Sequence, residues 1–101
     1  MERFVYTPNG VCSRKIDLVL NGDRIAMVKF TGGCSGNTQG LAAMLRDTMI
    51  DEAISRLEGI KCGFKPTSCP DQVAQALLLY KEKKSAGESF ESVNENEISR
   101  V

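Results

Sequence analysis

The chain has 101 residues, of which 42% are apolar, so it can bury the core of one small domain without disulfides. Its 13 basic and 13 acidic residues cancel, which argues against nucleic acid as a partner, and no segment approaches the roughly 20 apolar residues of a membrane span. Histidine is absent, which excludes Ser-His and Cys-His triads and histidine-ligated metal sites. Any chemistry therefore depends on cysteines and carboxylates.

The first third of the chain predicts a three-stranded antiparallel meander. Asn9-Gly10 and Asn21-Gly22 each lie between apolar or alternating runs. Such pairs favour hairpin turns because both residues tolerate positive φ. The middle strand is expected to place Ile16, Leu18 and Leu20 on one face.

Three helices are expected to follow the meander, because apolar residues then recur at helical spacing. The first series is Leu41, Met44, Leu45 and Thr48, and the second is Ile50, Ala53, Ile54 and Leu57. Gly59 is expected to end the second helix, and the third is expected over about residues 70–84. The predicted fold class is α+β, with the three helices packed on one face of the meander.

The run Thr67-Ser68-Cys69-Pro70-Asp71 is typical of a helix N-terminus. Proline is tolerated mainly in the first turn, so we expect Pro70 as the first helical residue, Cys69 as the N-cap and Asp71 as a first-turn acid. A thiol at this position indicates chemistry, because a helix N-terminus stabilises thiolate.

The chain is expected to divide into a domain over residues 1–84 and a disordered acidic tail over 85–101. The tail has four acidic residues, one basic residue and little apolar content. The N-terminus lacks the apolar region of a secretory signal, which predicts a cytoplasmic protein with reduced cysteines.

Four cysteines are therefore candidates for metal binding: Cys12, Cys34, Cys62 and Cys69. Cys34 lies in a glycine-rich turn that leads into a helix, and the neighbouring glycines allow close backbone approach to a ligand. The residues expected to support this site are Gly32, Gly33, Asn37, Lys65 and Asp71. Two alternatives are burial of the cysteines as small apolar residues and phosphate binding by the glycine-rich turn.

Three blocks in this order resemble the TSCPD-domain proteins: residues 32–37, residues 57–63 and Thr67 to Gln72. The resemblance covers about residues 3–83. Members occur as small free-standing bacterial proteins, and a similar domain forms the C-terminal part of cobalamin-dependent ribonucleotide reductases. The resemblance implies a role accessory to ribonucleotide reduction. About 100 residues are too few to hold ribonucleoside-diphosphate reductase activity alone.

A weaker resemblance is to NifU-like iron–sulfur scaffold proteins. Cys12, Cys34 and Cys69 follow the order and spacing of that family's three cysteines, which bind a cluster or zinc. The chain departs from the pattern at Arg14, where the family has an acidic residue, and at Lys65, which lies four residues before Cys69. Cys62 is extra and is the candidate fourth ligand.

The leading hypothesis is a small module that binds zinc or an iron–sulfur cluster through thiolates. It implies a protein partner, either ribonucleotide reductase or a cluster-delivery system. The first alternative is a thiol redox partner that delivers electrons to a ribonucleoside-diphosphate reductase. The second is a nucleotide- or protein-binding module with structural cysteines.

Overall fold

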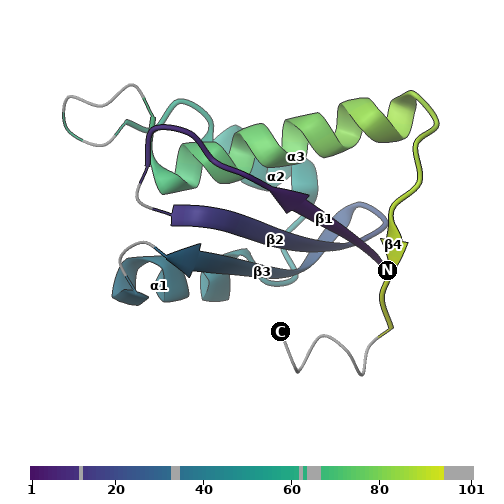
Figure 1. The fold of residues 1–101 in the computed structure, drawn as a ribbon, viewed down its shortest axis with the longest axis horizontal. Helices are drawn as coiled ribbons and strands as arrows, with labels where there is room; N and C mark the ends of the chain where they lie inside the picture. The colour runs from purple at the N-terminus through teal and green to yellow at the C-terminus, as the bar shows by residue number, and fades with distance from the viewer. Residues whose placement is uncertain (12, 33–34, 62, 64–66, 95–101) are drawn as a thin grey trace.

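The computed structural model describes residues 1–11, 13–32, 35–61, 63 and 67–94 (Figure 1). Its elements in chain order are β1 (Glu2–Tyr6), β2 (Ser13–Asn21), β3 (Arg24–Gly32), α1 (Ser35–Leu45), α2 (Ile50–Leu57), α3 (Cys69–Ser85) and β4 (Glu91–Ser92). The strands form one antiparallel sheet in the order β3-β2-β1-β4. The α+β class and the meander are confirmed, and β4 is an additional short strand. None of the described helices is long and apolar enough to cross a membrane.

The two predicted hairpins close in different ways. Asn21 pairs with Arg24, so β2 and β3 are joined by the two residues Gly22 and Asp23, and Gly22 takes the positive φ of 62° that the turn needs. Tyr6 pairs with Ile16, so the connection from β1 to β2 is a wide loop rather than a tight turn at Asn9-Gly10.

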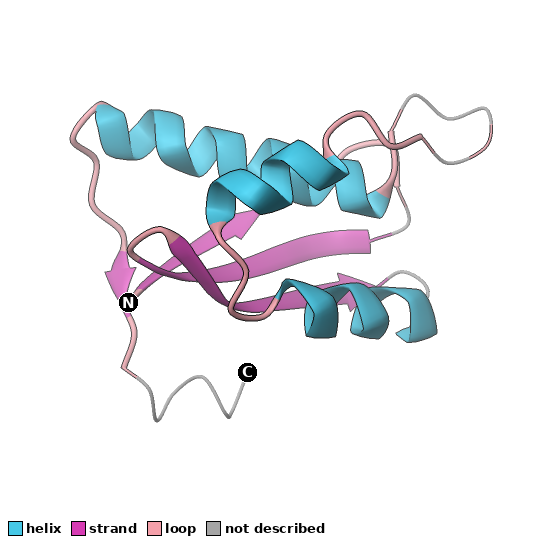
Figure 2. Ribbon diagram, turned by 180° about the vertical axis from the view of Figure 1, so that it is seen from behind, coloured by secondary structure: helices cyan, strands magenta, loops and turns pink. Residues whose placement is uncertain are grey.

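The core lies between one face of the sheet and the helices (Figure 2). The predicted inward residues of β2, including Ile16 and Leu18, are fully buried. Leu45 of α1, Ile54 of α2 and Leu77 of α3 belong to the same cluster, so all three helices contribute to one core. This burial is the main stabilising term, because a short sheet alone is only marginally stable.

The first helix differs from the sequence-based prediction at its end. α1 stops at Leu45, Met44 is 81% exposed, and Thr48 lies outside the helix. Asp47 takes a φ of 65°, and residues 47–48 exchange backbone hydrogen bonds with Ile25 on the edge of β3, both at 2.8 Å. Pairing with the sheet edge therefore overrides the helical pattern. The second helix has the predicted buried face, and Gly59 follows its end with a φ of 86°.

The segment after α3, which belongs to the expected tail over residues 85–101, contacts the start of β1 in its described part. Ser85 still belongs to α3, and the Phe90 ring centroid lies 5.4 Å from that of Phe4 and 5.2 Å from that of Tyr80. Val93 is buried, and its N–H donates to the Met1 carbonyl at 2.8 Å. Two apolar side chains in a polar segment suffice to dock it, which its average composition does not reveal.

Phe90→Ala should lower the free energy of unfolding by about 2 kcal/mol, because a half-buried aromatic ring loses its contacts with Phe4 and Tyr80. Urea unfolding measures the change. Ser89→Ala, at an exposed neighbouring position, is the control and should stay within about 0.5 kcal/mol of the native chain. Equal stability of Phe90→Ala and the native chain would contradict docking of the tail.

Candidate cysteine site

The N-terminus of α3 is capped by Ser68, not by Cys69. Ser68 has extended backbone angles, with φ −147° and ψ 171°, and its Oγ accepts the Asp71 N–H at 3.2 Å. The predicted N-cap at Cys69 is therefore wrong: Cys69 is the first helical residue and Pro70 the second. The physical reason is that a hydroxyl oxygen accepts a hydrogen bond far better than a thiol sulfur. Asp71 lies in the first turn, as predicted.

Two further bonds attach the cap to the preceding loop. The Ser68 hydroxyl donates to the Ile60 carbonyl at 2.7 Å, and the Gly59 N–H donates to Asp71 Oδ1 at 2.7 Å. The Thr67 hydroxyl donates to the other Asp71 oxygen. The end of α2 and the start of α3 are thus joined through buried polar groups that satisfy one another.

The same hydrogen bonds determine the charge state of Asp71. The Thr67 hydroxyl holds the pKa of Asp71 below its ordinary value. Hydrogen bonds from the Gly59 backbone and the Gln75 side chain act in the same direction, whereas burial raises the pKa. The net shift is downward, so the folded protein favours the charged carboxylate.

The wide β1–β2 loop packs on this helix start. The Asn9 N–H donates to Gln72 Oε1 at 3.0 Å, and Gln72 Nε2 donates to Thr67 Oγ1 at 2.9 Å. Gly10 has a φ of 73°, and a Cβ there would lie 3.1 Å from Thr67 Cγ2. The loop therefore approaches α3 closely, which explains a glycine at this position.

Cys69 faces the start of β2. Its partly exposed free thiol lies with Sγ 3.2 Å from the Oγ of Ser13, a residue that is only 3% exposed. Ser13 pairs in the sheet with Gly32, the last residue of β3. The start of α3, the start of β2 and the end of β3 thus meet at one end of the domain (Figure 1).

Much of the predicted site lies outside the described residues, namely Cys12, Cys34, Cys62, Gly33 and Lys65. Gly32 ends β3 with a φ of 82°, and Asn37 lies in α1. Within the described ranges, no three Cys, Asp or Glu side chains are close enough together to hold a metal ion. Whether the four sulfurs meet therefore stays a prediction.

Each of the other three cysteines has a described residue within two positions that is linked to Cys69 directly, through Ser13 or through Ser68. Ser13 is the residue after Cys12, and it contacts Cys69. Gly32, two residues before Cys34, pairs with Ser13. Ile60, two residues before Cys62, accepts the hydrogen bond of Ser68, the neighbour of Cys69.

Comparison with known families identifies the family of this chain. The sequence model of the TSCPD domain family matches residues 2–81, which is more than half of the chain. The chain belongs to the TSCPD domain family. No curated protein and no solved structure matches it. In this TSCPD domain, the hydroxyls and the carboxylate of residues 67–71 hold the helix, and the thiol is directed at β2.

The sequence-based prediction missed two residues of the site around Cys69, namely Ser68 and Ser13. Ser68 has a local signal, because Ser68 followed three residues later by Asp71 resembles a capping box. Ser13 has none, since its contact with Cys69 joins residues 56 positions apart.

Asp71→Asn should destabilise the domain at pH 7, and the difference from the native chain should shrink as the pH falls. Because the folded pKa of Asp71 is lowered, its contribution is fully present above the unfolded carboxyl pKa of about 3.9 and is lost as the pH falls through the lower folded value. Urea midpoints of both chains at pH 7, 5 and 3 measure this.

Asp47→Asn is the matched control, because its side chain is exposed and asparagine tolerates the φ of 65° equally well. A stability difference for Asp71→Asn that is the same at every pH would contradict the charged role of Asp71.

Proposed function

We propose that this TSCPD domain is a cysteine-site module that binds zinc or an iron–sulfur cluster. Its ligands are Cys12, Cys34, Cys62 and Cys69. The observation that carries the proposal is the contact between Cys69 Sγ and Ser13 Oγ at 3.2 Å, because it joins the last cysteine segment to the residue beside the first.

Covalent geometry supports convergence of the four thiols. Consecutive Cα atoms are about 3.8 Å apart, so a cysteine two residues from Gly32 or Ile60 has its Cα within about 7.6 Å of that residue's Cα. Gly32 is tied to Ser13, and Ile60 is tied to Ser68. A metal site among the four cysteines therefore requires the chain to span only two residues beyond Gly32 and two beyond Ile60.

The donor chemistry selects the kind of metal. Thiolates without histidine favour zinc or an iron–sulfur cluster over harder ions such as magnesium or calcium. Cys69 is partly exposed in the first turn of α3, so its sulfur is accessible to a metal ion. The Ser13 hydroxyl is positioned to donate to a ligating thiolate, as outer residues of metal sites commonly do.

Such a module needs a partner and a reducing environment. We propose that it acts with ribonucleotide reductase or a cluster-delivery system, as the TSCPD and NifU-like resemblances imply, and that it works in the cytoplasm, where thiolate ligands stay reduced.

Anaerobically purified protein should contain close to one equivalent of zinc or of cluster iron per chain, and Cys69→Ala or Cys34→Ala should lose it. Elemental analysis with visible absorption measures the content. Ser55→Ala, at an exposed helix position, is the control that keeps the metal, and far-UV circular dichroism checks that each variant is folded. Metal-free native protein with four freely titratable thiols would contradict the proposal. If mild oxidation then joined Cys69 to another cysteine, the electron-delivery role would replace it.

Ser13→Ala should weaken metal binding by about tenfold without abolishing it, because it removes a hydrogen bond to a ligand rather than a ligand. Competition with a chromophoric zinc chelator gives the affinity. Ser13→Thr keeps the hydroxyl and should bind more tightly than Ser13→Ala. Equal affinity of the native chain and Ser13→Ala would show that the hydroxyl plays no part.

A further inference from the structure

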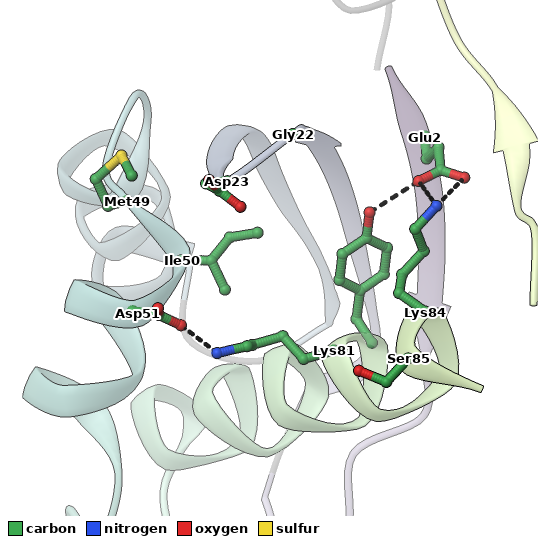
Figure 3. Close-up of a pocket in the computed structure, with 10 residues that line it drawn as sticks. Glu2, Gly22, Asp23, Met49, Ile50, Asp51, Lys81, Lys84 and Ser85 are labelled. Carbon is green, nitrogen blue, oxygen red and sulfur yellow. Dashed lines mark hydrogen bonds and ion pairs between the residues drawn. The ribbon is translucent and has the colours of Figure 1, made fainter. Parts of the chain in front are cut away.

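A cleft of about 450 Å³ lies near the opposite end of α3 from Cys69 (Figure 3). Four segments form it: the start of β1, the turn between β2 and β3, the first turn of α2 and the last turns of α3. Its size falls within the range of small-molecule sites. It shares no residue with the cysteine site.

The walls of the cleft are held in place by bonds between these segments. The Ile50 N–H donates to the Asp23 carbonyl at 2.8 Å, which joins α2 to the β2–β3 turn. The Tyr80 hydroxyl donates to Glu2 Oε1 at 2.9 Å, and Lys84 pairs with the same carboxylate at 2.9 Å. A cleft that is formed before a ligand arrives costs less to occupy.

The charge states of this wall follow from these contacts. Lys84 and, after it, the Tyr80 hydroxyl lower the pKa of Glu2. Burial, followed by the hydrogen bond to Glu2, raises the pKa of Tyr80 to about 12. At neutral pH Glu2 is therefore a carboxylate and Tyr80 a neutral phenol. The charges of Glu2 and Lys84 on this wall neutralise each other.

The unmatched charge in the cleft is negative. Glu2 pairs with Lys84, and Asp51 pairs with Lys81, so both lysines are already engaged. In the described part of the chain, no ion pair or hydrogen bond engages the Asp23 carboxylate, which points toward the open space beside Ile50 in Figure 3. An anionic ligand would have to displace a carboxylate from a lysine and then lie near Asp23.

The lining of the cleft also includes the apolar side chains of Met49 and Ile50. Met49 is 38% exposed, although it is a large apolar residue, and it lies next to the buried Ile50. The thioether side chain is flexible and adapts to differently shaped apolar groups. A ligand with carbon atoms near its charge would therefore cover Met49 while its charge meets Asp23.

From these contacts we infer that the cleft binds a small organic amine. The ammonium group pairs with the Asp23 carboxylate, and the apolar body packs against Met49. Lys81 and Lys84 remain in their ion pairs with Asp51 and Glu2.

The test is an amide NMR titration of the full chain with phenethylamine, with phenylacetate and 2-phenylethanol as the anionic and neutral analogues. Phenethylamine should shift the amide signals of Gly22, Asp23 and Ile50, and the two analogues should shift them much less. Asp23→Asn should weaken phenethylamine binding by about fivefold, the upper end for an exposed ion pair. Asp47→Asn, an exposed acid that does not line the cleft, should bind like the native chain.

Equal shifts with phenylacetate, or unchanged affinity in Asp23→Asn, would overturn the inference. A capped pentapeptide with one central lysine provides a further arm, because a partner chain presents the same ammonium group. Tighter binding of this peptide than of phenethylamine would show that the ligand is a partner chain, which would overturn the inference of a small amine. None of these outcomes depends on metal content, so they are independent of the cysteine site.

Discussion

The hydrogen bond from the Asp71 N–H to Ser68 Oγ is the constraint on which the candidate site depends. It sets the residue at which α3 begins, and so it places Cys69 in the first turn, facing β2. The Ser68 hydroxyl also donates to the Ile60 carbonyl, so the same residue holds the segment that precedes Cys62. The cap therefore positions the Cys69 thiol as well as starting the helix.

The polar network around this cap also explains why the motif is so polar and yet largely buried. Ser68 and Asp71 are 5% and 7% exposed, and their partners satisfy them. Buried polar groups of this kind are costly when a partner is lost, so they favour one arrangement over its alternatives. Of the side chains in this motif, the partly exposed Cys69 thiol is the one that remains available for chemistry.

α3 connects two separate parts of the molecule. Its 17 residues span about 25 Å, with Cys69 at the first turn and the cleft beside its last turns. The centre of the helix packs in the core through Val73 and Leu77, which are fully buried. Because the centre of α3 is buried, the positions of Cys69 at its first turn and of the cleft beside its last turns are both set by the packing of this one helix.

The sequence by itself determined the α+β class, the buried faces of β2 and α2, and the start of α3 to within one residue, because these depend on local periodicity and turn chemistry. It also indicated the family, through three ordered blocks. Tertiary structure decided the rest. Thr48 lies outside α1, although it fits the helical pattern, because its carbonyl accepts a hydrogen bond from Ile25 at the edge of β3. Phe90 holds a polar segment against the domain through its ring contact with Phe4. Ser13 reached Cys69, and Asp23 joined the cleft, through contacts between residues far apart in the chain. Periodicity and capping act over a few residues, whereas these contacts depend on how the sheet and helices pack, which no short window of sequence contains.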